Sequence, residues 1–286
     1  IDKGESHFNA VLTTGTGSSQ AVTGVGFQPD FIWGKRRDSS GHHTLFNSVR
    51  GVTKGLEPSN GTNAEFTSTD YYSSFDSDGF TIAAGASGAG NGSSQTAIQW
   101  CWKAGGTAPS KTYKVVVVSD SGNKYRFGDP TFAESALTLD LQEGGTYTFD
   151  LSDGTVDGHP MLFSTTSNGT HNSGVTYETG VVYKLDGVVK TKSQYVDTTA
   201  FNAATTRQII ITVAASAPTL YYYCNYHGGM GGQINTNSLF GSTNLDGAVK
   251  SIVSENTTSG FSIVKWTAPG SGSAINVGHG LGAIPK

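Results

Sequence analysis

The chain has 286 residues, a length that suits one to three domains. Its 18 basic and 22 acidic residues make up 14% of the sequence, against about 25% in ordinary soluble domains, and the net charge is −4. The absence of a basic stretch excludes an electrostatic surface for nucleic acid. Glycine is enriched at 39 residues and aromatics reach 10%, without excess proline, so the chain is neither collagen-like nor disordered.

No apolar run approaches the roughly 18 residues that a membrane-spanning helix requires. Residues 1–30 lack a signal-peptide pattern and the first residue is Ile, so we expect a processed or partial product. The two cysteines, Cys101 and Cys224, are too few for a disulfide scaffold. The sequence therefore predicts no membrane span and leaves the redox compartment open.

Taken in chain order, the sequence shows frequent strand patterns and almost no helical periodicity. No run of apolar residues at i, i+3, i+4 and i+7 extends beyond one turn. Segments rich in β-branched and aromatic residues, bounded by Gly, Asp, Asn or Pro, are typical of strands. The clearest are residues 113–119, 137–141, 146–151, 207–214 and 219–224. An all-β protein with very little helix follows from this pattern.

Glycine-rich stretches divide the chain into three segments. Residues 104–110 (AGGTAPS) have the composition of a linker, and residues 228–237 (GGMGGQINTN) close the middle segment. We therefore predict domains at 1–106, 107–236 and 237–286, of which the first two are β-sandwich-like.

The first and third segments share a pattern. Residues 6–26 and 259–280 both run Ser-x-Phe, an apolar pair, a Gly/Ser turn and a closing glycine. We interpret this as a module that is complete at 1–106 and represented at 237–286 only by its opening hairpin. Chance similarity of two Gly/Ser-rich hairpins is the alternative. Because a lone hairpin is marginal in water, the third segment should dock on a neighbouring domain or subunit, or continue in a longer chain.

Cys101 lies between Trp100 and Trp102 in a segment of alternating character. Side chains alternate between the two faces of a strand, so we expect Cys101 to point inward, and we place Ile98 inward with it. Neither residue is part of a recognisable site.

The sharpest chemical signal is residues 221–232 (YYYCNYHGGMGG), in which a strand pattern leads into a glycine-rich loop. Cys224, His227 and Met230 follow the spacing Cys-x2-His-x2-Met. A thiolate, an imidazole and a thioether on one short loop suit a soft metal ion, and one further imidazole completes a copper ligand set. The candidate is His159, at the mouth of another strand. The metal-free alternative is that Cys224 is simply a small buried apolar residue.

These residues resemble those of cupredoxins, the Greek-key β-sandwiches of the plastocyanin and amicyanin type. The resemblance covers residues 110–236 and implies that His159, Cys224 and His227 are equatorial copper ligands and that Met230 is a weak axial ligand. One position departs from the family pattern: the residue after the first His commonly donates its backbone N–H to the cysteine sulfur, but here it is Pro160, which has none. We therefore expect copper binding to be easier to demonstrate than fast electron transfer.

The flanking segments contain a series of short motifs: 26–33 (GFQPDFIW), 46–51 (FNSVRG), 74–80 (SFDSDGF), 99–103 (QWCWK) and 277–286 (VGHGLGAIPK). These motifs resemble a module that is repeated in virion proteins of tailed phages, and the last of them resembles the opening of that module. The Tyr-rich Cys…His…Gly-Met-Gly domain is also similar to parts of large tail-fibre and appendage proteins of aquatic phages.

Two functions remain after this survey. The resemblance implies a structural component of a phage particle, a tail-fibre or appendage segment that acts in assembly or host attachment. Its partners would be other virion subunits, copies of itself and a host surface receptor, and its location would be the virion. The alternative is a secreted or periplasmic blue-copper electron carrier. We do not expect an enzyme, because nucleophile-elbow, P-loop and dinucleotide signatures are lacking.

Overall fold

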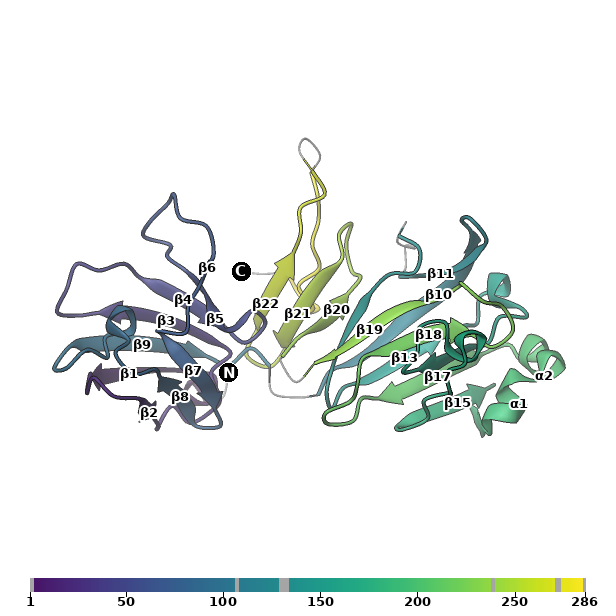
Figure 1. Ribbon diagram of the computed structural model, residues 1–286, viewed down its shortest axis with the longest axis horizontal. Coiled ribbons are helices and arrows are strands. Elements are labelled where there is room, and N and C mark those ends of the chain that lie inside the picture. Colours follow the sequence, from purple (N-terminus) through teal and green to yellow (C-terminus); the bar gives the residue numbers. More distant parts are fainter. Residues whose placement is uncertain (1–2, 106–107, 129–133, 238–239, 271–273, 285–286) are drawn as a thin grey trace. The chain divides into compact units, whose positions relative to one another are not determined.

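The computed structural model describes residues 3–105, 108–128, 134–237, 240–270 and 274–284 (Figure 1). Within them it has 22 strands, two short α-helices and four 3-10 turns, which confirms the all-β prediction. Two compact units form. The first unit comprises Ile1–Thr107, Val253–Lys265 and His279–Lys286, and the second unit comprises Ala108–Ile252 and Trp266–Gly278. None of the helices in the described ranges is long and apolar enough to cross a membrane.

The first unit packs two sheets against one shared core. The larger sheet has the order β1-β9-β3-β4-β5-β6 and the smaller has the order β2-β8-β7. Buried side chains of both sheets, such as Ile32, Phe46 and Phe80, form a single cluster between them. The strand bounds are β1 Phe8–Thr14, β2 Gln20–Val22, β3 Phe31–Arg36, β4 Thr44–Asn47, β5 Gly51–Leu56, β6 Phe66–Thr67, β7 Tyr72–Asp76, β8 Gly79–Ile82 and β9 Thr96–Trp102. Short 3-10 turns lie at Gly4–Ser6 (η1) and Ser87–Ala89 (η2).

Strand β9 shows how alternation distributes side chains in this unit. Ala97, Gln99 and Cys101 are buried, whereas the even-numbered residues of the strand are only partly covered. Cys101 therefore points inward, as predicted. The inward placement of Ile98 was wrong, because Ile98 shares the parity of Trp100 and Trp102 and so lies on their face of the sheet.

A buried carboxylate fixes the end of β9. Asp30 is 1% exposed, and its Oδ2 accepts hydrogen bonds from the backbone N–H groups of Ala104 at 2.9 Å and Gly105 at 2.7 Å. Burial raises the pKa of Asp30, and hydrogen bonds from Gly105, Ser48 and Ala104 oppose that rise. The start of the predicted linker is thus held to the first unit, while the predicted boundary at 106/107 lies outside the described residues.

The second unit is also built on two sheets around one core. Their orders are β11-β10-β13-β17-β15-β16 and β12-β19-β18-β14. Most pairs are antiparallel, but β10 with β13 and β12 with β19 are parallel. Bounds are β10 Ser110–Ser119, β11 Asn123–Phe127, β12 Leu139–Gln142, β13 Thr146–Asp150, β14 Met161–Ser164, β15 Val181–Leu185, β16 Val188–Lys190, β17 Arg207–Thr212, β18 Leu220–Cys224 and β19 Gly232–Asn237. The 3-10 turns η3 and η4 span Gly154–Val156 and Gly169–Asn172.

The five strands predicted from sequence in this unit correspond to β10, β12, β13, β17 and β18. Two short helices, α1 (Lys192–Val196) and α2 (Thr198–Ala203), were not predicted. Both carry recognisable N-caps: Thr191 forms a capping box with Gln194, and the Asp197 side chain accepts from the backbone N–H of Ala200. Both helices are too short to show apolar residues at i, i+3, i+4 and i+7, the pattern by which a helix is recognised in a sequence.

The C-terminal residues form a three-stranded sheet of β20 (Ser242–Asn244), β21 (Ser251–Asn256) and β22 (Phe261–Trp266), in that order. Strand β22 begins at Phe261, and β1 begins at Phe8, which occupies the matching place in the repeated pattern. Both phenylalanines therefore begin a strand, whereas Ser6 lies in a 3-10 turn and Ser259 lies in an ordinary turn. The units divide these residues differently from the predicted 237–286 domain, because 253–265 and 279–286 group with the first unit.

Candidate metal centre

Strand pairing in the second unit brings the predicted ligands to one sheet end. Cys224 is the last residue of β18, and it pairs with Met161 at the start of the antiparallel strand β14. His159 lies two residues before Met161, so it extends past the end of β18. The loop that carries His227 and Met230 leaves β18 at this same point.

Three of the four predicted ligands converge. The Cys224 Sγ atom lies 3.7 Å from the Nδ1 atom of His159 and 3.6 Å from the Nδ1 atom of His227. The two imidazole ring centroids are 4.6 Å apart, and the three potential ligand atoms lie within 4.8 Å of one another. Cys224 is buried, His159 is half-buried and His227 is exposed, so the cluster lies at the surface end of the core.

These separations fit a shared metal ion. A trigonal or tetrahedral site with metal–nitrogen bonds of about 2.0 Å and a metal–sulfur bond of about 2.3 Å places sulfur roughly 3.5–3.7 Å from each nitrogen. Both Sγ–Nδ1 distances, 3.7 and 3.6 Å, lie at this value. The donor set of two imidazoles and one thiolate is also the equatorial set that copper prefers.

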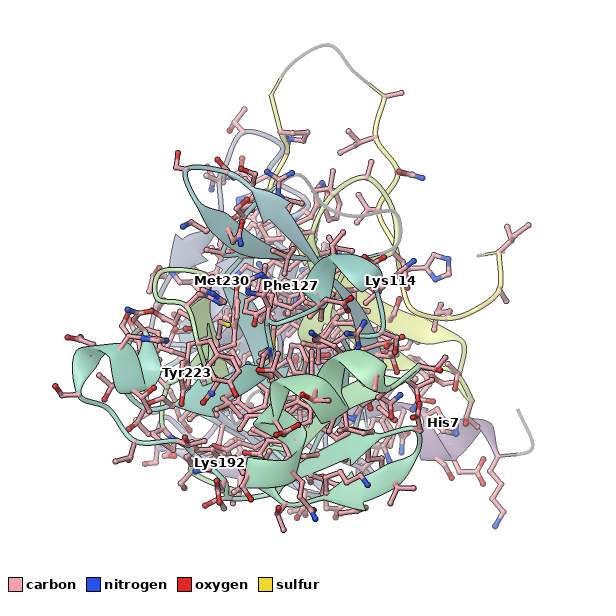
Figure 2. The ribbon with its side chains drawn as sticks, turned by 90° about the vertical axis from the view of Figure 1, so that its right-hand side faces the viewer. His7, Lys114, Phe127, Lys192, Tyr223 and Met230 are labelled. Carbon is pink, nitrogen blue, oxygen red and sulfur yellow. The ribbon has the colours of Figure 1, made fainter. Side chains whose placement is uncertain are left out.

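Met230 ends the ligand loop inside the core. Its side chain is 1% exposed and belongs to the same buried cluster as Cys224, Phe127 and Tyr223. Figure 2 labels Met230, Phe127 and Tyr223 within the second unit. The Met230 backbone carbonyl accepts a hydrogen bond from the Tyr125 N–H at 3.1 Å, which fixes the end of the loop. Its role as a fourth ligand stays a prediction.

Burial and hydrogen bonding act in opposite directions on the Cys224 thiol. Burial raises its pKa, whereas hydrogen bonds from the backbone N–H groups of Tyr226 and His227 lower it. Pro160 has no N–H to donate to this sulfur. The Tyr125 hydroxyl is directed at the His159 carbonyl, so support for the thiolate comes from the ligand loop itself.

Burial also lowers the pKa of His159, and the nearby His227 adds to this effect. A lowered pKa favours the neutral imidazole, the form that binds metals. His159 therefore suits metal binding at neutral pH.

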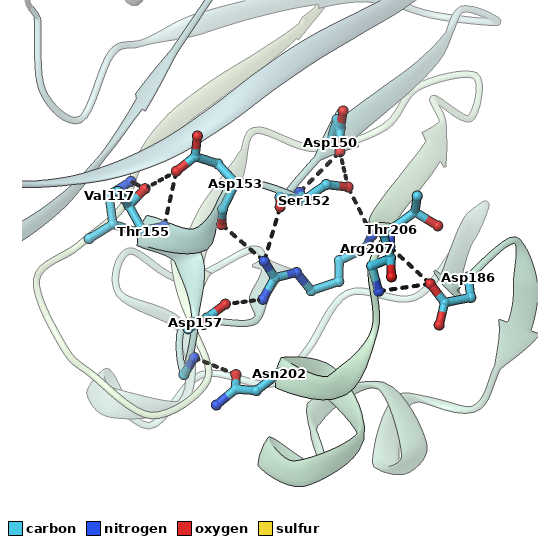
Figure 3. Close-up of polar contacts among 12 residues, drawn as sticks. Val117, Asp150, Ser152, Asp153, Thr155, Asp157, Asp186, Asn202, Thr206 and Arg207 are labelled. Atoms are coloured by element: carbon cyan, nitrogen blue, oxygen red, sulfur yellow. Dashed lines mark hydrogen bonds and ion pairs between the residues drawn. The ribbon is translucent and has the colours of Figure 1, made fainter.

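The loop that leads into His159 is fixed by a buried cation (Figure 3). Arg207 is 3% exposed; it pairs with the Asp157 carboxylate and donates to the backbone carbonyls of Ser152 at 3.1 Å and Asp153 at 3.0 Å. The Phe201 ring lies 5.0 Å from the guanidinium carbon, close enough for a cation–π contact. Segment 152–157 is thus held in place before the chain reaches His159.

Several residues around the site make contacts that the sequence does not predict, among them His171, which the sequence indicates only as a turn residue. The Nε2 atom of His171 lies 2.9 Å from the Cys224 carbonyl oxygen, so this histidine contacts the backbone of Cys224 and not its sulfur atom. Asn168 accepts from the Gly229 N–H at 2.7 Å, and Lys124 donates to the Gly229 carbonyl at 2.6 Å. No sequence signal identifies these contacts, because each joins residues 53 to 105 positions apart.

The fold and the cluster define a modular all-β protein whose second unit carries a buried cysteine between two histidines. The model of a family of domains of unknown function, DUF7483, matches residues 3–126 and 235–286, and the chain belongs to this family. No curated protein and no solved structure matches the chain. His159, Cys224, His227 and Met230 all lie in 127–234, between the two matched stretches, so family membership carries no information about the metal centre.

Proposed function

We propose that the second unit is a cupredoxin-like domain that binds copper through His159, Cys224 and His227, with Met230 as a weak fourth ligand. The observation that carries this proposal is the approach of two imidazole Nδ1 atoms to one buried thiol at 3.7 and 3.6 Å. The proposal includes two further elements, a Greek-key order of the strands and copper as the bound metal. A bound ion would supply a bond network that ties β14 to the loop after β18, and binding to the folded state alone would stabilise the unit.

The test is a copper titration of the purified chain. Cu(II) should produce an intense visible thiolate-to-copper band, and Cys224→Ser should abolish it. Cys101→Ser is the matched control, since Cys101 is also free and buried but lies in the first unit. Absence of the band in the unaltered chain would mean that the Sγ–Nδ1 contacts are only thiol–imidazole hydrogen bonds. A band that persists in Cys224→Ser would place the copper elsewhere.

We further propose that the chain is a structural component of a phage particle, in a tail fibre or appendage, where copper acts as a staple rather than a redox centre. Three features support this proposal: the Ser-x-Phe pattern recurs where strands begin at Phe8 and Phe261, the chain has few charged residues, and it is built of modules. Other virion subunits, further copies of the chain and a host surface receptor would be its partners. Mass spectrometry of purified virions should find the chain at many copies per particle, and its absence from virions would contradict the proposal.

A blue-copper electron carrier is the second candidate, and the exposure of His227 favours it. An exposed ligand imidazole offers an edge through which an electron can reach a partner. Fast electron self-exchange of the copper-loaded chain would support this function, whereas slow exchange with tight binding would support the staple.

A further inference from the structure

Strand β11 contacts both chain segments that carry the candidate ligands. Three consecutive residues take part: Asn123 lies against His159, Lys124 donates to Gly229, and Tyr125 bonds to both segments. The pairing of β14 with β18 and the bond from the Asn225 N–H to the Pro160 carbonyl at 3.0 Å already bring His159 and the ligand loop together. Strand β11 adds a third set of contacts, beyond the end of that pairing.

Tyr125 makes the two contacts that join the segments directly. Its hydroxyl donates to the His159 carbonyl at 2.8 Å, and its backbone N–H donates to the Met230 carbonyl at 3.1 Å. The side chain is fully buried, and its ring packs edge-on to Tyr222 at 6.2 Å. A buried hydrogen bond to a carbonyl is costly to break, so the bond to His159 is persistent.

Asn123 acts on the His159 ring itself. Its side-chain amide lies 3.3 Å from Nε2, the ring nitrogen opposite the one that faces Cys224. In a neutral imidazole whose Nδ1 is free to bind, Nε2 carries the proton and is a donor. In the structure the atom that faces Nε2 is the amide nitrogen of Asn123, so it donates to Nε2 and the ring proton lies on Nδ1. Metal binding at Nδ1 would move that proton to Nε2, and the Asn123 amide would then rotate so that its oxygen accepts it. In either state the contact restricts the orientation of the ring.

We propose that Tyr125, assisted by Asn123, is the positioning residue of the metal centre: it holds the His159 segment against the loop that carries Met230. The inference rests on the proposed copper site. It assigns a function to β11, whose residues contain no ligand. Contacts that orient metal ligands change metal affinity by about 10- to 100-fold when they are removed.

The test compares two tyrosines that make equivalent buried bonds. Tyr125→Phe removes the bond to the His159 carbonyl, and Tyr222→Phe removes a 2.8 Å bond to the Leu137 carbonyl in the same core. Both variants should lose similar stability. Only Tyr125→Phe should weaken copper binding about tenfold and shift the energy of the thiolate-to-copper band. Equal effects of the two variants on binding and band energy would overturn the proposal.

A second variant and a metal-free measurement keep the outcome decisive. Asn123 is exposed, so Asn123→Ala should fold normally and still weaken copper binding. Without metal, heteronuclear NMR of the His159 ring should show one orientation in the unaltered chain and exchange broadening in Tyr125→Phe but not in Tyr222→Phe. If the unaltered chain binds no copper, the proposed function fails, and the NMR comparison alone decides whether Tyr125 positions His159. Sharp His159 signals in Tyr125→Phe would contradict that role.

Discussion

Cys101 in the first unit and Cys224 in the second are both free, fully buried thiols on strands that have neighbours on either side. Cys101 lies within β9, where its nearest polar partner is the Gln99 carbonyl at 3.9 Å, and burial alone raises its pKa to about 12. Cys224 ends β18, where the chain leaves the sheet and two imidazoles reach the sulfur. Burial of a cysteine therefore does not determine its chemistry; its position along the strand does.

The units also differ in the sign of their buried charge. Asp30 in the first unit accepts from backbone N–H groups, and Arg207 in the second donates to backbone carbonyls. Each charged group fixes a segment that lacks regular sheet pairing. In the second unit that segment leads into His159, so the buried cation contributes to the candidate metal centre as well as to stability.

The largest expected effect comes from removing this cation. Arg207→Met should lower the free energy of unfolding of the second unit by about 3 kcal/mol, because two partly buried carbonyls lose a charged donor from a buried guanidinium. Arg36→Met is the control, since its ion pair with Asp38 is partly exposed and should contribute under about 1 kcal/mol. Urea unfolding followed by circular dichroism measures both. Similar losses of unfolding free energy in the two variants would show that the buried Arg207 network contributes no more to stability than the partly exposed ion pair.

Copper should raise the unfolding free energy of the second unit without changing that of the first. At a free concentration about 100-fold above its dissociation constant, copper should stabilise the second unit by about 2.7 kcal/mol and leave the first unit unchanged. Calorimetry with and without Cu(II) should show one shifted transition. A shift in both transitions would mean that the units unfold together, and a shift that survives Cys224→Ser would exclude the proposed centre.

The smallest effect concerns Asp30 and pH. Because burial raises the pKa of this carboxyl in the folded state, its contribution to stability is complete below the ordinary value of 3.8 and is lost as pH rises through the folded-state pKa. Asp30→Asn keeps an acceptor oxygen but cannot ionise. The stability of the unaltered chain relative to Asp30→Asn should therefore decline between pH 3.5 and 7. Urea unfolding at the two pH values tests this direction. A rise in relative stability with pH would show that the hydrogen bonds from the N–H groups lower the pKa of Asp30 more than burial raises it.

Local signals in the sequence were sufficient for five strands of the second unit and for singling out the Cys-x2-His-x2-Met loop. Composition and alternation identify β10 and β18, and ligand spacing identifies Cys224 and His227. His159 was proposed because the ligand set needs one further imidazole and this histidine lies at the mouth of another strand; the family resemblance then assigned it the role of an equatorial ligand. Its Nδ1 does lie beside the Cys224 sulfur.

What the sequence could not show are contacts that depend on sheet order. Tyr125, Asn123 and Arg207 occupy ordinary positions in a hairpin and a strand, and only the packed structure reveals which loops they touch. The misplacement of Ile98 has a simpler origin, because strict parity along β9 puts it on the tryptophan face.

The aromatic residues are distributed unequally between the two units. Trp33, Trp100 and Trp102 belong to the first unit, and the remaining one of the four tryptophans, Trp266, belongs to the second unit and is 51% exposed. The second core contains fully buried tyrosines, among them Tyr125, Tyr147, Tyr195, Tyr222 and Tyr223, and no buried tryptophan among its described residues. The change in tryptophan emission on unfolding should therefore come mainly from the first unit, and the change in tyrosine absorbance mainly from the second, so the two signals together weight the two transitions differently in one unlabelled sample.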